Sequence, residues 1–423
     1  MYIKNIVKIG EKMFKELKVD VILNRILNII IILYPFFLIR RSGTDSLTNL
    51  ILITTFICCL KNKKINLKME NKKIYVLFII SLFFILSSLI GNCLGENTVK
   101  HLNEYFFNLL LLFSILQIKL ESEIVFKIEK VFYCSLFLPI VVISVILIET
   151  KFKFVRVSGF WNISTYSFMI GLSTVISLYL LIYYKKYRYL ILMPFLYGMV
   201  LFSGTRMIWL ITFLLTFFIL LISKNKKIYI GLLLGIMTLL VVFYKTDNNN
   251  PIKYRIKTIA HTKSEHSSGT RIYMYKEALE QFKLKPINGN GFVTYGILAQ
   301  KRHTEELQDE TIKDYRKKKE AYGNWRYHSH NNFFELLCGT GILGTVSFYI
   351  ANLYLLYLLI KNRIKNNKKI MCDIGILTFL FYHMYGISDV TLYMGRVTEI
   401  YFFIVGVIIN LIITAEETKN IRI

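Results

Sequence analysis

The sequence predicts an all-α integral membrane protein with about twelve transmembrane helices and one large, partly helical extracytoplasmic loop. Hydrophobic residues make up 54% of the 423 residues and charged residues only 19%, against roughly 25% charged in soluble domains. Apolar runs of 15 to 20 residues recur between Val21 and Thr414, and each is long enough to cross about 30 Å of hydrocarbon as a helix. These features exclude a soluble globular protein, a disordered chain and an outer-membrane barrel, whose strands alternate apolar and polar residues.

The elements follow in chain order. Residues 1–20 are basic and amphipathic, and no small-residue cleavage site follows the first apolar run, so we expect them on the cytoplasmic membrane surface. Residues 21–244 hold predicted spans one to nine, and 332–414 hold spans ten to twelve. Between them, 245–331 is the large loop, and 415–423 is a cytoplasmic tail. The spans are expected at 21–39, 46–60, 73–90, 104–119, 131–148, 165–184, 188–202, 206–223, 228–244, 332–360, 371–388 and 396–414.

The distribution of basic residues predicts the orientation. An even number of spans places both termini on one side of the membrane. With both termini in the cytoplasm, the inner segments hold more than three times as many Lys and Arg residues as the short outer connections, as the positive-inside rule requires. The large loop then lies outside, and within it we expect a helix at Thr270–Lys283, a turn at Pro286–Gly291 and a solvated helix at 301–320.

A first candidate site is the short connection Ser-Gly-Thr-Arg at 203–206, between spans seven and eight. Arg206 opens the next helix on the predicted outer side. A guanidinium beside the free N–H groups of a helix start is suited to binding an anion. The alternative is an arginine whose side chain simply reaches the lipid headgroups.

A second candidate repeats the same four residues at 268–271, in the large loop, and ends with Arg271. Two arginines at helix starts on one face of the membrane would suit a diphosphate, which carries at least two negative charges. The alternative is a surface arginine that follows a Ser or Thr helix cap.

A third candidate is the polar segment His328-Ser-His330-Asn331, just before span ten. Histidine is the side chain best suited to take or give a proton near neutral pH. The two histidines could also be a metal pair, but no Cys, Asp or third His lies at ligand spacing nearby in the sequence. We therefore expect neither a metal nor any other cofactor. The alternative is a pair of ordinary interfacial histidines.

Other polar positions are weaker candidates. Arg156 and Asn162 flank an aromatic stretch in the predicted outer connection between spans five and six, where aromatic residues often serve as interfacial anchors. Asp389 is predicted to cap its helix or to pair with Arg396. Glu399 lies three residues after Arg396 and is predicted to form an ion pair with it along the helix.

Together these features resemble the O-antigen polymerase and O-antigen ligase family of bacterial polysaccharide enzymes. The ligase-type signature is a histidine and an Asn, Ser or Gln, then nine residues, then Gly-x-x-Gly-Thr. Here His330-Asn331 is followed by nine residues and then by Gly341-Ile-Leu-Gly344-Thr345, which is a complete match. The resemblance covers most of residues 150–390, whereas the N-terminal spans match only in hydropathy.

The resemblance implies a metal-independent, inverting glycosyl transfer on the outer face of the bacterial cytoplasmic membrane. The donor would be an oligosaccharide on undecaprenyl diphosphate. His330 would be the general base, and Arg206 and Arg271 would hold the departing diphosphate. The resemblance also implies further substrate-binding residues, which are Arg156, Asn162, His328, Asn331, Gly289 and Gly291. The structural residues of the motif would be Gly341, Gly344 and Thr345.

The acceptor is left open. The signature favours a ligase, which transfers glycan to a terminal acceptor. The richness in Ile, Lys and Asn suggests an AT-rich, often Gram-positive genome without a lipopolysaccharide core, and therefore favours a polymerase of capsular or exopolysaccharide repeat units. A lipid-linked oligosaccharide flippase is the alternative from another class. Membrane lipid is an expected partner, a flippase and a chain-length regulator are expected companions, and no nucleic acid is expected.

Overall fold

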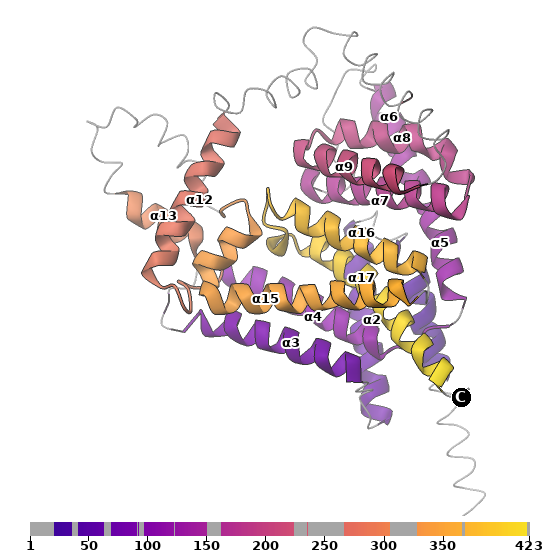
Figure 1. Ribbon diagram of the computed structural model, residues 1–423, viewed down its shortest axis with the longest axis horizontal. Helices are drawn as coiled ribbons and strands as arrows, with labels where there is room; N and C mark the ends of the chain where they lie inside the picture. The colour runs from indigo at the N-terminus through magenta and orange to yellow at the C-terminus, as the bar shows by residue number, and fades with distance from the viewer. Residues whose placement is uncertain are drawn as a thin grey trace, which may run out of the picture.

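The computed structural model describes residues 21–35, 41–62, 69–90, 92, 97–121, 123–149, 162–223, 235, 266–304, 328–365 and 369–420. Within these ranges the chain forms helices joined by short connections, with no strand (Figure 1). A first helix covers Val21–Pro35. It is followed by α2 (Arg41–Asn62), α3 (Met69–Ser87), α4 (Thr98–Gln117), α5 (Ile124–Ser135), α6 (Phe137–Glu149), α7 (Ile163–Tyr184), α8 (Arg188–Ser203), α9 (Arg206–Ile222), α12 (His266–Leu284), α13 (Tyr295–Thr304), α15 (Asn332–Ile364), α16 (Lys369–Tyr385), the short 3₁₀ helix η1 (Thr391–Tyr393) and α17 (Gly395–Asn420).

The predicted all-helical class is confirmed for the described residues, and every predicted span except the ninth coincides with a helix. The fifth span is divided at Leu136 into α5 and α6. The ninth span, at 228–244, and the amphipathic segment 1–20 lie outside the described residues, apart from Gly235. The helix predicted at Thr270–Lys283 is present as the core of α12, whereas most of the charged stretch 301–320 lies outside the described residues.

Three of these helices are long and apolar enough to cross a membrane by themselves. They are Ile163–Tyr184, Asn332–Ile364 and Gly395–Thr414. Shorter apolar helices cover Val21–Pro35, Ser46–Cys59, Arg188–Ser203 and Arg206–Ile222. The protein is therefore a helical membrane protein, while the count of twelve spans and their orientation remain predictions.

The helices pack as a bundle around α7 and α17. The apolar windows of both helices are 89% buried, against 44% for α15. Figure 1 shows α12 and α13 together at the end of the bundle where α15 begins. Both of these helices contact α15, so residues 266–304 of the predicted loop pack on the helix that begins at the His-Asn motif.

A buried polar cluster ties the start of α17 to the first two helices. Glu399, only 3% exposed, accepts hydrogen bonds from the hydroxyl groups of Tyr34 and Thr48. Its other oxygen lies 2.5 Å from the Arg396 guanidinium. The predicted Arg396–Glu399 ion pair is thus confirmed. Because a carboxylate is expensive to bury without partners, these contacts fix the position of α17.

Candidate active site

The His-Asn motif lies at the start of α15. Asn331 caps this helix, because its side-chain oxygen accepts from the backbone N–H groups of Phe333 (2.8 Å) and Phe334 (3.2 Å), a contact typically worth about 1 kcal/mol. The backbone of His330 just before the cap has a positive φ of 55°, which is uncommon for a residue other than glycine. The chain therefore turns sharply at His330, immediately outside the helix.

A second connection, between α16 and η1, is bonded to this turn. Asn331 donates its side-chain N–H to the carbonyl of Ile387 (2.8 Å), and the backbone N–H of Asn332 donates to Gly386 (2.8 Å). The Asn332 side chain also donates to the hydroxyl of Thr391 (2.6 Å). These contacts hold the two connections together, and they bring Asp389 to the histidines.

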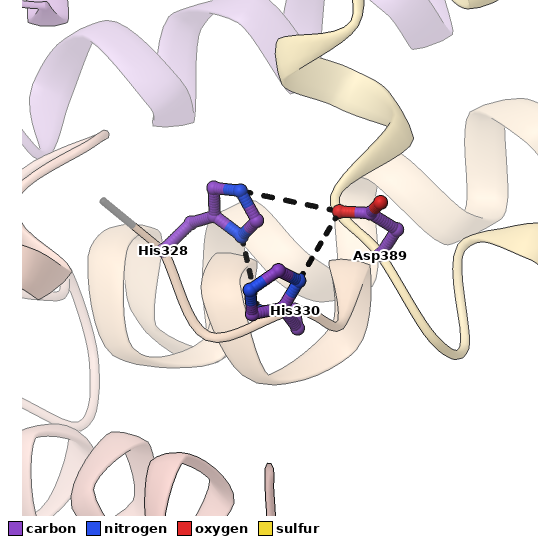
Figure 2. A group of neighbouring side chains, drawn as sticks. All are labelled: His328, His330 and Asp389. Carbon is purple, nitrogen blue, oxygen red and sulfur yellow. Dashed lines mark hydrogen bonds and ion pairs between the residues drawn. The ribbon is translucent and has the colours of Figure 1, made fainter. Parts of the chain in front are cut away.

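Figure 2 shows His328, His330 and Asp389 pointing toward one another. Asp389 Oδ1 lies 3.4 Å from His330 Nδ1 and 3.9 Å from His328 Nε2. The backbone N–H of His330 donates to His328 Nδ1 over 3.2 Å. All three side chains are partly exposed, with 23%, 32% and 16% of their surface accessible for His328, His330 and Asp389. The cluster can therefore be reached from outside the protein.

The charge state of two members follows from their surroundings. Burial and the neighbouring charge of His330 lower the pKa of His328 to about 4, although Asp389 opposes this. Burial alone would raise the pKa of Asp389, but its contact with His330 and the charges of both histidines outweigh burial and lower it. Near neutral pH, His328 is therefore neutral and Asp389 is a carboxylate.

The structure corrects two expectations about Asp389. The predicted pairing with Arg396 is wrong, since Arg396 pairs with Glu399 and Asp389 faces the two histidines. No third metal-binding group lies near the histidines along the sequence. In space, Asp389 brings a third donor, and the ligand atoms of the three residues all lie within 4.8 Å of one another.

Glu335 is a further part of the site that the sequence did not reveal. It is 2% exposed, accepts from the backbone N–H of Ser329 (2.7 Å) and accepts from the hydroxyl of Tyr393 (2.8 Å). The Tyr393 ring stacks on His101 of α4, with 4.7 Å between ring centroids, and lies 6.3 Å from the His328 ring. A carboxylate inside an apolar run was the signal that could have revealed Glu335.

The glycines of the two motifs meet each other. Gly291 donates its N–H to the carbonyl of Gly339 (2.8 Å). A Cβ on Gly289 would lie 2.3 Å from that same carbonyl oxygen, and a Cβ on Gly341 would lie 2.2 Å from the carbonyl oxygen of Ile287. Gly289 and Gly341 also have positive φ angles of 75° and 64°. Only glycine fits this backbone contact, in which the predicted turn at 286–291 packs on a kink in α15.

The remaining motif residues stabilise the kink. Gly341 interrupts the helical φ/ψ of α15, and the hydroxyl of Thr345 donates to its carbonyl (2.7 Å). A Cβ on Gly344 would lie 2.3 Å from Thr340 Oγ1. The structure thus gives Gly289, Gly291, Gly341, Gly344 and Thr345 a packing role, and substrate binding by the first two remains a prediction.

Replacing Gly341 with alanine is expected to destabilise the protein strongly. The new Cβ would meet a backbone carbonyl, in a conformation that by itself costs about 1–3 kcal/mol for a non-glycine residue. The measurement is the melting temperature of detergent-purified protein. Gly198→Ala in α8 is the matched control, because nothing lies within 4 Å of a Cβ there and alanine favours a helix. Equal melting temperatures for the two variants would refute the proposed packing role.

Arg271 lies in α12, which packs beside this cluster. The Tyr275 ring, one helical turn further on, stacks on Phe334 of α15 at 4.7 Å. The hydroxyl of Tyr275 donates a hydrogen bond to the backbone carbonyl oxygen of Ile387 over 3.3 Å. The positive charge of Arg271 is close enough to contribute to the lowered pKa of His328. The structure therefore brings the second predicted arginine to the histidines, although 56 residues separate Arg271 from His328 in the sequence.

Arg206 begins α9 at the same end of the bundle. The hydroxyl of the preceding threonine lies 2.7 Å from the hydroxyl of Ser167 in α7. Phe168, which follows Ser167 in α7, stacks on Tyr385 with 6.0 Å between ring centroids. The backbone carbonyl of Tyr385 accepts a hydrogen bond from the backbone N–H of Asp389 (3.2 Å). The start of α9 is thus connected to the Asp389 turn through α7, while diphosphate binding by Arg206 remains a prediction.

The last two predicted residues are not brought into the cluster by any described contact. Asn162 caps α7, because its side-chain oxygen accepts from the backbone N–H of Thr165 (2.8 Å). Arg156 lies outside the described residues. Their predicted roles in substrate binding stay untested.

A separate apolar cavity lies away from the histidines. Its volume is about 340 Å³, and its lining comes mainly from α5, α7, α16 and α17. Residues such as Phe132, Met169, Ile176 and Phe403 line it. Such a lining suits an apolar chain and not a charged diphosphate.

Comparison with known proteins identifies the segment that carries these features. Residues 191–349 match the family model described as O-Antigen ligase. The matched segment contains Arg206, Arg271, the glycine turn and the whole His-Asn…Gly-x-x-Gly-Thr motif, and the resemblance seen in the sequence is thereby confirmed. Asp389 lies beyond it. No curated protein matches the chain.

Proposed function

We propose that this chain, whose residues 191–349 match the O-Antigen ligase family model, joins lipid-linked oligosaccharide repeat units into a long capsular, extracellular or O-antigen polysaccharide. The donor is an oligosaccharide on undecaprenyl diphosphate, and the reaction takes place at the outer face of the cytoplasmic membrane. The observation that carries this proposal is the His330–Asp389 pair (3.4 Å). A neutral His328 lies beside this pair, and the charge of Arg271 is close enough to act on His328.

His330 is the proposed general base. Its Nδ1–H faces the Asp389 carboxylate, which leaves Nε2 with the lone pair that takes the proton of the acceptor hydroxyl. As that proton leaves, the acceptor oxygen forms a bond to the anomeric carbon. Asp389 then stabilises the imidazolium that results. A positioned base of this kind accelerates transfer by about 10²–10⁴-fold.

The arginines act on the leaving group. When the bond between the anomeric carbon and the phosphate oxygen breaks, the electron pair leaves with the diphosphate. The guanidinium groups of Arg206 and Arg271 bind the negative charge that develops, which stabilises the transition state more than the bound donor. Because attack and departure take place on opposite faces of the sugar, the product has inverted configuration.

A ligase is the second candidate. The matched family model is described as O-Antigen ligase, and the complete motif from His330 to Thr345 is of the ligase type. The chemistry is the same for both enzymes, and only the acceptor differs. A polymerase uses the sugar of another lipid-linked unit, whereas a ligase uses a terminal acceptor.

A deletion strain of the source bacterium tests these proposals. Surface glycan and lipid-linked intermediates are separated on gels from the deletion strain and from a strain complemented with the wild-type gene. Single repeat units on the lipid carrier in the deletion strain, and long chains on complementation, are the expected result for a polymerase. Full-length polymer that stays on the lipid carrier would instead identify a ligase. Repeat units that accumulate only on the cytoplasmic side would identify a flippase and overturn the proposed chemistry.

A further inference from the structure

Three metal-binding side chains converge at the entrance of the candidate active site. His328 and His330 come from the turn before α15, and Asp389 comes from the connection after α16 (Figure 2). One nitrogen from each histidine and one carboxylate oxygen lie within 4.8 Å of one another. All three side chains are partly exposed. The Nδ1 atom of His330 is itself buried and has no hydrogen-bond partner among the described residues, so it is a polar atom that an ion would satisfy.

The donor set suits a zinc-like ion. Imidazole nitrogens and carboxylate oxygens bind Zn²⁺ at about 2.0–2.2 Å, which places two ligand atoms of a tetrahedral ion about 3.4 Å apart. His330 Nδ1 and Asp389 Oδ1 are already 3.4 Å apart, and His328 Nε2 is 3.9 Å from the same oxygen. Two nitrogens and one oxygen do not suit Mg²⁺ or Ca²⁺, which prefer oxygen ligands.

Some charges around the three residues favour a bound cation, and others oppose it. The carboxylates of Asp389 and Glu335 favour a cation, whereas Arg271 lies close enough to act on His328 and opposes one. His328 Nδ1 also accepts the backbone N–H of His330. That contact is lost when Nε2 binds a metal, because the ring proton must then move to Nδ1. Both costs make the site one of moderate affinity, unlike a structural zinc site.

We propose that His328, His330 and Asp389 bind a zinc-like divalent ion, and that the bound ion inhibits glycosyl transfer. The second half of this proposal rests on the proposed function. A neutral imidazole carries one proton and one lone pair. When the Nδ1 of His330 carries the ring proton and faces Asp389 at 3.4 Å, Nε2 is free to act as a base. When a metal occupies Nδ1, the proton lies on Nε2, and the ring cannot take a proton from the acceptor.

Metal binding is tested directly on the full-length protein, purified in detergent without a histidine tag and treated with a chelator. Co²⁺ is the spectroscopic probe, because tetrahedral Co²⁺ gives visible absorption bands, and Zn²⁺ is then added in competition. We expect one ion per protein molecule, and at least about tenfold weaker binding in Asp389→Ala and His328→Gln, as expected from the loss of one ligand. Melting temperatures show that both variants are folded.

Glu121→Ala is the control for binding. Glu121 is an exposed carboxylate that pairs with Lys127 at 3.1 Å, and it is not grouped with other metal-binding side chains among the described residues. Its replacement is expected to leave the Co²⁺ bands and the affinity unchanged. No bands with wild-type protein, or equal binding by wild type and Asp389→Ala, would overturn the metal site.

Transfer activity is then measured with lipid-linked repeat units at increasing Zn²⁺ concentration. Inhibition with the same midpoint as binding, reversed by EDTA, is the expected result. Binding without inhibition would overturn the inhibitory role while the metal site stands. Loss of activity on EDTA treatment, restored by zinc, would overturn both the inhibitory role and the metal-independent mechanism.

Discussion

His330→Ala is expected to abolish long-chain polysaccharide, with a fall in transfer rate of about 10²–10⁴-fold. The alanine side chain has no group that can take the proton of the acceptor hydroxyl. Asp389 then keeps its charge but has no imidazole to orient. The measurement is the rate of polymer formation by purified protein in lipid vesicles, together with the length of surface glycan in a complemented deletion strain.

The control for this loss is the folded state of the variant. His330 packs at a partly exposed turn, and the helix cap is made by Asn331, so the variant is expected to keep its membrane level and its melting temperature. His330→Gln keeps a polar side chain of similar size, and we expect it to be equally inactive. Long polymer made at a normal rate by either variant would show that His330 is not the general base.

The pH dependence of wild-type transfer adds a second readout. Near neutral pH, Asp389 is charged and His328 is neutral. Burial and the charge of His330 lower the pKa of His328 to about 4, whereas the pKa of Asp389 is lowered because its contact with His330 and the histidine charges outweigh burial. The transfer rate is therefore expected to fall as the pH drops toward about 4, where His328 gains a proton and the cluster gains a positive charge. The rate of the wild-type protein at a series of pH values measures this fall, and a rate that stays constant down to about pH 4 would contradict it.

Arg206→Lys is the second substitution with a large expected effect, a fall in transfer rate of about 10²–10³-fold. Lysine keeps the positive charge but cannot present a planar pair of N–H donors to phosphate oxygens. The leaving diphosphate should therefore be stabilised less in the transition state. The rate with lipid-linked repeat units measures this effect, and the wild-type protein at equal membrane level is the reference.

Arg25→Lys is the matched control for this substitution. Arg25 is an exposed residue of the first helix, on the predicted cytoplasmic side, and the same chemical change there is expected to leave the rate unaltered. If Arg206→Lys were as active as Arg25→Lys, Arg206 would be only an anchor for lipid headgroups. The anion-binding role would then rest on Arg271 alone.

Several parts of the site could be predicted from the sequence because their causes are local. Hydropathy over a window of about 20 residues depends on composition alone, so the helices were predicted close to their observed ends. The start of α15 follows from Asn331, which is a good helix cap in any tertiary context. The turn at Pro286–Gly291 follows from residues that favour turns wherever they stand.

Other parts could be known only from the packing of distant segments. Asp389 reaches His330 because hydrogen bonds from Asn331 and Asn332 hold the connection after α16, and no local pattern predicts such a contact. The sequence therefore suggested a pairing of Asp389 with Arg396, which is nearer along the chain. The division of the fifth span at Leu136 was likewise invisible in a continuous apolar run.

The sequence by itself determined the membrane class, the resemblance to the O-antigen ligase family and the histidine at the helix start, because hydrophobic runs, caps and motifs depend on neighbouring residues. The tertiary structure alone decided that Asp389 faces His330, that Glu335 holds the turn through Ser329, and that the two glycine motifs pack on each other. These are contacts across helices, and their geometry depends on how whole helices pack.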